Sequence, residues 1–318
     1  MSNLADPAIL FFLFGVFAGL VKSNLEIPQP ISRFLSLYLL MALGLKGGFA
    51  LAHSGLTLSV ASGLFVALVL AFLVPVIGYA LLRRVISGFD AAAIAATYGS
   101  ISAVTFITAT RYLEDSGIPY GGHMAAAAAL MESPAIVMAI LFANSLRKQT
   151  VGSVQQHSVG SVLKESLTDG AQLLLLGAMV VGIVSGEAGK AAMQPFSGDL
   201  FKGMLAFFLL DMGLMTARNF PPFRSLSPRL VAYAVGGPVV HATLALGLST
   251  LFGLSAGDAG LLMVLAASAS YIAVPAVLRF ALPEANPSLY FGLSLGLTFP
   301  INILVGIPTY IWIAQQWL

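Results

Sequence analysis

Two segments of this chain, residues 90–111 and 258–279, repeat the same order of residues at a constant offset of 168 positions. Each copy begins with Asp-Ala, has a short serine-containing run nine positions later, and ends with Arg. The run is Gly-Ser-Ile-Ser at 99–102 and Ala-Ser-Ala-Ser at 267–270. Apolar residues surround both runs, so each copy has the pattern of a hydrophobic helix interrupted in its middle. Such a pair constrains the chain to fold as two related halves.

The composition places the chain in a lipid bilayer. Of its 318 residues, 58% are hydrophobic and 9% are charged, and the mean hydropathy is +0.93. A soluble protein of this length needs far more polar surface, so we expect a polytopic membrane protein. The net charge of +2 and the scattered basic residues predict no nucleic-acid partner. The absence of cysteine excludes disulfides and thiolate ligands.

Ten apolar runs approach the length of about 20 residues that a helix needs to cross a bilayer. They predict an all-α polytopic membrane protein with ten transmembrane helices. The first 21 residues contain no Lys or Arg, so the first run is interpreted as a retained span and not as a secretory signal. The predicted spans are Pro7–Val21, Ile31–Ala52, Thr57–Leu82, Ala91–Leu113, Gly122–Leu146, Gly170–Ser185, Leu200–Ala217, Pro228–Phe252, Ala259–Leu282 and Ser288–Trp317.

Lys and Arg are distributed unevenly between the connections of these spans. With the N-terminus outside, eleven of the fifteen lie in cytoplasmic connections. Only Lys46, Arg111, Lys190 and Lys202 lie on the external side. Cytoplasmic loops of membrane proteins carry the excess of positive charge. We therefore expect both termini on the external face of the plasma membrane, which is the inner membrane in a bacterium.

A polar linker at residues 149–169 divides the chain into two five-span halves, 1–148 and 170–318. An odd number of spans per half inserts the second half upside down relative to the first. The repeat extends beyond the opening motif, since residues 38–45 align with 207–214, and Glu-Ser-Pro at 132–134 aligns with Thr-Phe-Pro at 298–300. The sequence therefore predicts a 5+5 inverted repeat with two interrupted helices.

The interruptions predict a binding site. Unpaired backbone in hydrocarbon is costly, so an unwound Ser-x-Ser run is tolerated only against protein or a wet cavity. Each break also exposes the N-terminus of a half-helix, whose free N–H groups and positive dipole end favour an anion. The alternative is that the small residues only permit close helix packing. We expect a small anion or carboxylate to bind at Gly99, Ser100, Ile101, Ser102, Ala267, Ser268, Ala269 and Ser270.

Polar residues within other spans indicate where a coupling ion binds. Charge at membrane depth is costly and is usually functional. Glu132 lies near the middle of the fifth span; its repeat mate is Thr298, and Asn302 follows one turn later. Hard cations prefer such oxygen ligands, and we predict a sodium site formed by Thr105, Glu132, Thr298 and Asn302. The alternative is a protonated Glu132 that bonds to backbone freed by Pro134.

Several of these motifs resemble the sodium-dependent bicarbonate transporters of cyanobacteria and their bacterial relatives. In the second half the resemblance rests on residues 267–270, on Pro275 and above all on Leu-Pro-Glu-Ala-Asn-Pro-Ser at 282–288. In the first half it rests on 99–102, on Thr105 and on Glu-Ser-Pro-Ala at 132–135. The resemblance covers essentially the whole chain.

The resemblance implies import of bicarbonate coupled to sodium, with the anion held between the two broken helices. It implies a core domain of spans three to five and eight to ten, a gate or scaffold domain of the remaining spans, and an elevator-like displacement of the core. It also implies a homo-oligomer, often a trimer. Two positions depart from the cyanobacterial pattern: Tyr271 replaces an Asp, and Glu132 replaces the Asp of an Asp-Ile-Pro run.

The cyanobacterial proteins also have a long acidic central loop that helps to engage a regulator resembling the PII signalling proteins. The linker at 149–169 is short, so a PII-like partner stays an open possibility for this chain.

Other classes of function fit the sequence less well. The chain has no Ser-His-Asp ordering, metal-ligand spacing or Gly-rich phosphate loop, so we expect neither an enzyme nor a cofactor beyond the coupling ion. Within transport, the alternative is a sodium- or proton-coupled carrier of another small anion or short carboxylate. A non-transporting membrane sensor is a further alternative, although the sequence offers no output domain.

Overall fold

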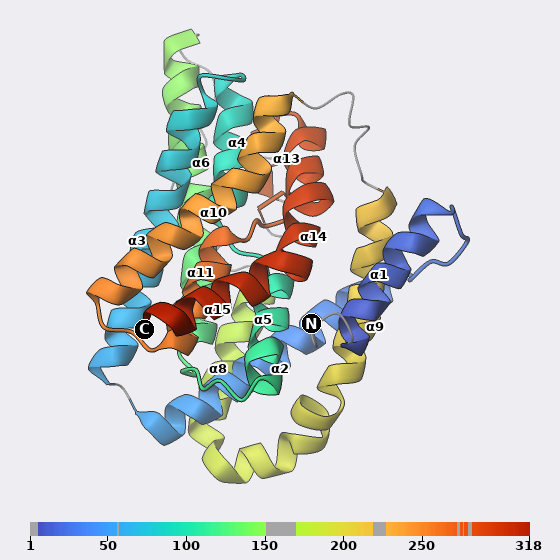
Figure 1. The fold of residues 1–318 in the computed structure, drawn as a ribbon, viewed down its shortest axis with the longest axis vertical. Helices are drawn as coiled ribbons and strands as arrows, with labels where there is room; N and C mark the ends of the chain where they lie inside the picture. Colours follow the sequence, from blue (N-terminus) through green and yellow to red (C-terminus); the bar gives the residue numbers. More distant parts are fainter. Residues whose placement is uncertain are drawn as a thin grey trace.

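The computed structural model describes residues 6–55, 57–150, 170–218, 227–271, 274–275, 277–278 and 282–318. All regular structure in these residues is helical, and no strand occurs among them (Figure 1). The helices are α1 (Pro7–Leu20), α2 (Gln29–Ser54), α3 (Leu58–Leu82), α4 (Gly88–Gly99), α5 (Ala103–Asp115), α6 (Met124–Thr150), α8 (Gly170–Met193), η2 (Gln194–Asp199), α9 (Phe201–Arg218), α10 (Pro228–Leu251), α11 (Ala256–Ala267), α13 (Pro287–Leu293), η4 (Ser294–Thr298), α14 (Phe299–Ile301), η5 (Asn302–Gly306) and α15 (Ile307–Trp317).

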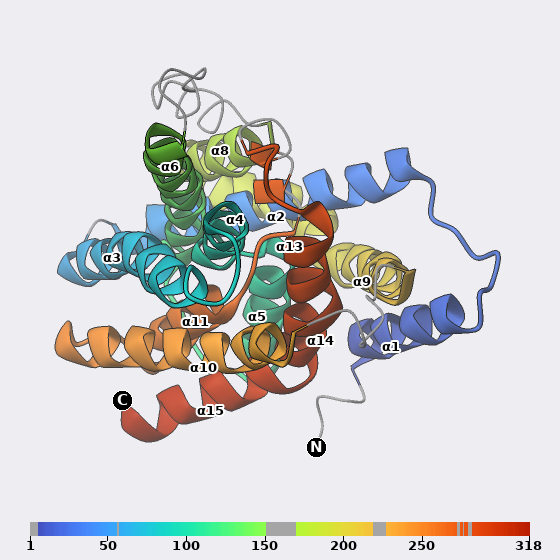
Figure 2. The same ribbon diagram turned by 90° about the horizontal axis from the view of Figure 1, so that it is seen from above.

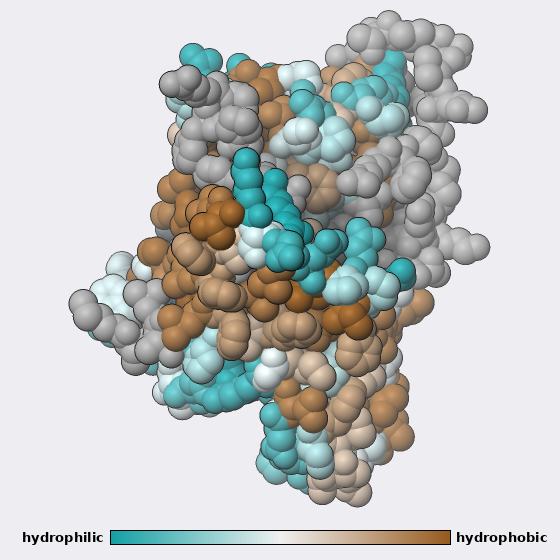
Figure 3. All heavy atoms as spheres, turned by 90° about the vertical axis from the view of Figure 1, so that its right-hand side faces the viewer, coloured by the Kyte–Doolittle hydropathy of each residue, from teal (hydrophilic) through white to brown (hydrophobic). Residues whose placement is uncertain are grey.

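Seven helical stretches in the described chain are long and apolar enough to cross a membrane. Their outward faces carry large apolar side chains that no protein atom covers, and Figure 3 shows such side chains over much of one face. Apolar surface of this extent is unfavourable in water and is stable against lipid. The chain is therefore an integral membrane protein. Examples of these exposed side chains are Phe11, Phe14 and Phe17 on α1, Val180 and Val184 on α8, and Val239 and Val240 on α10.

The helices form two groups according to which elements they contact. In the first group, called here the outer helices, α1 packs along α9 and α2 packs along α8. Seen from above, α1 and α9 lie side by side at the margin of the molecule (Figure 2). The second group, called here the inner bundle, contains α3 to α6 and α10 to α15. Within it α3 contacts α4 and α6, while α11 contacts α10 and α15.

Glycines allow the outer helices to approach closely. A Cβ on Gly213 of α9 would meet backbone atoms of α1, including the Cα of Gly15 at 3.0 Å. Likewise, a Cβ on Gly48 of α2 would lie 2.8 Å from the Cα of Gly182 on α8. In lipid, where burying apolar surface between helices gains little, close backbone packing of this kind holds helices together.

The duplicated Asp residues join the two halves of the inner bundle. Asp90 is in the first turn of α4, and its Oδ1 accepts the backbone N–H of Asn286, just before α13, at 2.7 Å. Asp258 is in the first turn of α11, and its Oδ1 accepts the N–H of Gly121, just before α6, also at 2.7 Å. Each Asp thus forms a hydrogen bond to the loop that precedes the last predicted span of the other half.

The ends of the fifth and sixth predicted spans differ from the observed helix ends by more than three residues. The helix that begins at Met124 continues to Thr150, past the predicted end of the span at Leu146 and into the predicted linker. In α8 the backbone leaves helical geometry at Gly186, with φ 54° and ψ −144°, directly after the predicted end of the sixth span at Ser185.

Some predictions fall on residues outside the described part of the chain. They concern Arg279, which closes the second repeat, and most of the linker, residues 151–169.

The glycine contact between α1 and α9 can be tested within one helix. Gly213→Ala places a methyl group against the backbone of α1, and overpacking of this kind costs about 1–3 kcal/mol. Gly203→Ala is the matched control, because a Cβ there meets no atom within 4 Å. We expect Gly213→Ala to lower the thermal unfolding temperature in detergent and Gly203→Ala to leave it unchanged or raise it slightly. Equal temperatures for the two variants would contradict the close contact.

Candidate functional site

The first predicted interruption lies between α4 and α5. Helix α4 ends at Gly99, and Ser100 is extended, with φ −90° and ψ 177°. The Oγ of Ser102 then caps α5 by accepting the N–H of Thr105 at 3.2 Å. Serine is a preferred residue at this position because its hydroxyl satisfies an N–H that has no partner within the helix. A Cβ on Gly99 would lie 2.7 Å from the ring of Pro75 in α3, which explains the glycine at the break.

The second predicted interruption has the same local geometry. Helix α11 ends at Ala267, and Ser268 is extended, with φ −80° and ψ 167°. The Oγ of Ser270 accepts the N–H of Val274 at 3.3 Å, and the described residues that follow are again helical. Both interruptions predicted from the duplicated pattern are therefore confirmed.

The two breaks cross and satisfy each other's backbone. The N–H of Ser102 donates to the Oγ of Ser268 at 3.0 Å, and the N–H of Ser270 donates to the carbonyl of Thr97 at 2.8 Å. These groups lie within a protein interior that lipid surrounds, where an unpaired N–H would be costly. Neither helix could unwind at this depth without the other, so the crossing is a single structural unit built from both halves of the chain.

A cavity of about 60 Å³ adjoins this crossing on the side of the outer helices. A single water needs about 10–15 Å³ by this measure, so the cavity has room for a small polyatomic ligand. The inner bundle contributes both breaks and α6, and the outer helices contribute α2 and α8. The lining residues are Ser36, Leu40, Leu43, Ile101, Ser102, Ala103, Val104, Phe106, Ala128, Ala129, Glu132, Leu175, Ser270 and Tyr271.

The N-terminus of α5 opens into this cavity. Ala103 and Val104, the first two residues of the helix, form part of its wall. The first N–H groups of a helix have no partner within it and carry the positive end of its dipole. This end of the cavity is therefore favourable for negative charge, while Glu132 places a carboxyl group in the same wall.

Some of the residues predicted to bind the anion line the cavity, whereas the others lie buried in the crossing of the two breaks. Ile101, Ser102 and Ser270 line the cavity. Ser268 does not, because its hydroxyl donates to the carbonyl of Leu265 at 2.8 Å and accepts from the backbone of Ser102. The hydroxyl of Ser100 is buried and has no hydrogen-bond partner among the described residues. Gly99, Ala267 and Ala269 are buried within the crossing and do not line the cavity.

The four residues predicted to bind sodium occupy different places. Glu132 lines the cavity, and Thr105 lies beside it, with its Oγ1 donating to the Oγ of Ser102 at 2.9 Å. Thr298 and Asn302 do not line the cavity. The hydroxyl of Thr298 is 2.6 Å from that of Tyr98 and donates to the carbonyl of Ala234 at 2.8 Å.

Asn302 is bound to the end of the second broken helix. Its Nδ2 donates to the carbonyl of Ala267, the last residue of α11, at 2.8 Å. Its Oδ1 is buried and has no hydrogen-bond partner among the described residues. A carbonyl oxygen in this state is a possible ligand for a hard cation.

Sequence reasoning missed the contribution of the outer helices. Ser36, Leu40 and Leu43 face the cavity from α2, at the spacing of four and three residues that places side chains on one face of a helix. That periodicity is visible in the sequence, but nothing in it indicates which neighbour the face meets. Tyr271 also lines the cavity, and its ring packs edge-on against Phe299 with centroids 5.1 Å apart.

A larger hollow, of about 740 Å³, lies beyond this cavity between α2, α8 and the loop that follows α5. It is called here the vestibule. Lys46 of α2 forms an ion pair with Glu114 of α5 at 3.1 Å across it, and Tyr120 donates a hydrogen bond to Glu114 at 3.1 Å. Burial of the hydroxyl, followed by the charge of Glu114, raises the pKa of Tyr120, so this side chain remains a neutral donor.

These features define a helical membrane protein with a small cavity beside two interrupted helices, mostly apolar but with a few polar groups in its wall; paired interrupted helices are typical of transporters. Residues 7–315 match the model of the Na+-dependent bicarbonate transporter superfamily. The chain therefore belongs to this superfamily, and the relationship predicted from its motifs is confirmed. Comparison with curated proteins gave no match.

The crossing can be tested with a pair of repeat mates. Ser268→Ala removes the acceptor of the Ser102 N–H, and an unsatisfied buried donor costs about 1–3 kcal/mol. Ser100→Ala is the control, since its hydroxyl has no partner among the described residues. We expect thermal unfolding in detergent to show a clear loss of stability for Ser268→Ala and little change for Ser100→Ala. The reverse order would contradict the observed pairing.

Proposed function

We propose that this protein imports bicarbonate together with sodium, and that the anion binds in the cavity beside the crossed helices. The observation that carries the proposal is the composition of that cavity, in which both serine runs and the N-terminus of α5 meet in a space of about 60 Å³. Family membership supports bicarbonate as the substrate.

The chemistry of the cavity suits a small oxyanion. Bicarbonate has four heavy atoms, one negative charge and oxygen atoms that accept hydrogen bonds. The hydroxyls of Ser102 and Ser270 and the first N–H groups of α5 are donors that replace part of its hydration shell. The apolar remainder of the wall excludes water and so strengthens these interactions.

Glu132 gives a physical reason for coupling. A carboxylate and an anion in one small cavity repel each other, and the repulsion is strong where little water screens it. A sodium ion bound near both negative groups removes that repulsion, so the two ions bind more tightly together than separately. In this proposal Glu132 and Thr105 hold the sodium from the side of the cavity. Thr298 and Asn302, the other two ligands predicted from the sequence, do not line this cavity.

The inverted repeat accounts for the helices of the described chain. The stretch Leu173–Arg218 has 46 residues, about twice the length that one crossing needs. If it crosses twice, and the shorter apolar helices Pro7–Leu20 and Ala256–Ala267 each cross or enter the membrane, the seven long stretches become ten spans. Five spans then lie in each half, 1–148 and 170–318, on either side of the linker.

Alternating access follows from the division into two groups of helices. The cavity lies between the inner bundle and the outer helices, and both groups line it. In the proposed elevator-like mechanism, the inner bundle slides along the outer helices and carries its bound ions from one side of the membrane to the other. The distribution of basic residues supports external termini, and the plasma membrane, which is the inner membrane in a bacterium, is the location that the proposed import requires.

The outer helices also offer a surface for assembly. Their exposed apolar side chains are available to lipid or to a second copy of the chain, which fits a homo-oligomer such as a trimer. A PII-like regulator would bind on the cytoplasmic side, to which the distribution of basic residues assigns the linker.

A second candidate is a carrier of a short carboxylate. The observation that favours it is the apolar part of the cavity wall, where Leu40, Leu43 and Ile101 could contact a methyl group. Such a carrier would use the same donors for the carboxylate group.

Uptake of labelled bicarbonate into proteoliposomes, with and without an inward sodium gradient, tests the function. Uptake that needs the gradient supports the proposal. Equal uptake in both conditions would contradict sodium coupling. No bicarbonate uptake, combined with uptake of labelled acetate, would favour the second candidate.

The place of the anion can be tested by removing one hydroxyl. Ser270→Val replaces a donor in the cavity wall with a methyl group and fills part of the space. We expect bicarbonate uptake to fall by at least about tenfold, the equivalent of about 1.4 kcal/mol. Thr243→Val, on the exposed face of α10, is the matched control and should transport normally. Normal uptake by folded Ser270→Val would place the anion elsewhere.

The coupling role of Glu132 can be tested by neutralising it. Glu132→Gln keeps the shape of the side chain and removes the charge that attracts a cation. We expect the sodium concentration for half-maximal uptake to rise by about tenfold. Glu26→Gln, an exposed residue between α1 and α2, is the control. An unchanged sodium dependence in Glu132→Gln would assign this side chain a structural role.

A further inference from the structure

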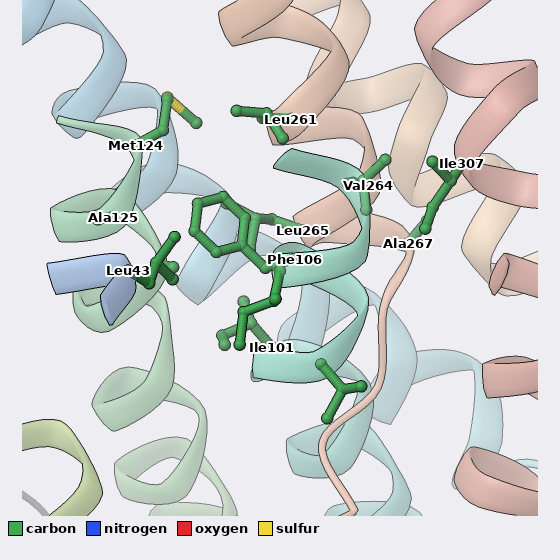
Figure 4. Packing of buried hydrophobic residues seen from close by; sticks show 14 of the residues in the cluster. Leu43, Ile101, Phe106, Met124, Ala125, Leu261, Val264, Leu265, Ala267 and Ile307 are labelled. Atoms are coloured by element: carbon green, nitrogen blue, oxygen red, sulfur yellow. The ribbon is translucent and has the colours of Figure 1, made fainter. Parts of the chain in front are cut away.

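The vestibule and the cavity have two lining residues in common, Leu43 and Phe106. Leu43 belongs to the outer helix α2, and Phe106 belongs to α5 of the inner bundle. Both side chains are buried, with exposed fractions of 4% and 1%, in the same apolar cluster. Figure 4 shows the side chain of Leu43 directed toward the ring of Phe106, with Ile101 nearby. The two side chains therefore lie where one hollow ends and the other begins.

We propose that Leu43 and Phe106 form an apolar gate that closes the cavity toward the vestibule. This inference rests on the proposed transport function and adds the route by which the anion enters. A charged solute must lose much of its hydration to pass between two apolar side chains, and a narrow apolar constriction also excludes water. In this structure the gate is closed and the vestibule is open on its far side.

An ion pair on the vestibule side of the gate also joins α2 to α5. Lys46 follows Leu43 by three residues on one face of α2, and Glu114 lies in the last turn of the helix that carries Phe106. Their side chains, 27% and 28% exposed, meet at 3.1 Å. Partly exposed pairs contribute little stability, so this bond can break at small cost when α5 moves relative to α2. One displacement thus opens the gate and separates the pair.

The residues of the vestibule indicate the side from which it opens. It includes Lys46, Lys190 and the loop 117–122, which the charge distribution places outside the membrane. The gate therefore controls entry from the external side, as an importer requires. Only one of the gate residues belongs to the inner bundle, so a movement of that bundle past the outer helices separates the two.

The chain contains no cysteine, so single cysteines report access without a background signal. Ser36→Cys places a thiol in the cavity, and Ala50→Cys places one in the vestibule. Each single-cysteine variant is treated, in intact cells, with a charged thiol reagent that does not cross the membrane. We expect fast labelling of Ala50→Cys and slow labelling of Ser36→Cys.

Truncating the gate should admit the reagent. In the Ser36→Cys background, Phe106→Ala should increase the external labelling rate by at least about tenfold. Leu43→Ala opens the other side of the gate and should act in the same direction, which covers the case that Phe106→Ala does not fold. Phe208→Ala is the matched control, because this buried phenylalanine of α9 lines neither hollow. It should leave the rate unchanged.

Three outcomes would overturn the gate. They are fast external labelling of Ser36→Cys with both gate residues intact, an unchanged rate in folded gate variants, and an equal increase in Phe208→Ala. Faster labelling from the cytoplasmic side, measured in inverted vesicles, would contradict the direction of the opening. The labelling rates are measured without bicarbonate. A failure of the uptake experiment would therefore leave the gate supported, and a failure of the labelling experiment would leave the transport function supported.

Discussion

The reciprocal hydrogen bonds between the two broken helices are the contacts on which the rest of this structure depends. Each break leaves backbone groups unpaired at membrane depth, where water cannot satisfy them. The side chain of Ser268 accepts from the backbone of Ser102, and the backbone of Ser270 donates to the carbonyl of Thr97. The two halves of the chain must therefore fold together, and the point where they cross is fixed. The Asp90 and Asp258 contacts reinforce the same exchange between halves.

A site at this crossing has a consequence for movement. Most polar groups of the cavity belong to the inner bundle, and α2 and α8 complete its wall with the apolar residues Leu40, Leu43 and Leu175 and with Ser36. In the proposed elevator-like mechanism the crossing would carry its ligand as one body along a surface that is mostly apolar. Polar contacts across this boundary include the partly exposed pair of Lys46 and Glu114, which contributes little stability, and a long, buried hydrogen bond of 3.5 Å from Thr216 of α9 to the carbonyl of Leu295. In that mechanism, binding depends mainly on residues of the crossing, and displacement depends on the contacts between the inner bundle and the outer helices.

The duplicated motif predicted both breaks and placed the candidate site beside them. It did not distinguish Ser268 from Ser270, although both are serines in the same short run. Ser268 pairs with the backbone of the other break, whereas Ser270 faces the cavity. The repeat mates Glu132 and Thr298 also differ, since Glu132 lines the cavity and Thr298 bonds to Tyr98 and to α10. Sequence symmetry indicates equivalent positions in two halves, but only packing decides what each position meets.

The sequence by itself determined that this chain lies in a membrane, that it is built from helices and that two of them are broken by serine runs. These properties follow from composition and from the backbone's need for hydrogen bonds, which are local and can be read along the chain. The tertiary structure alone decided which serines of the two runs line the cavity, that α2 completes it, and that Leu43 and Phe106 lie between it and the vestibule. Those properties depend on contacts between residues far apart in the chain. The spacing within one helix predicts a face, and only the fold selects its neighbour.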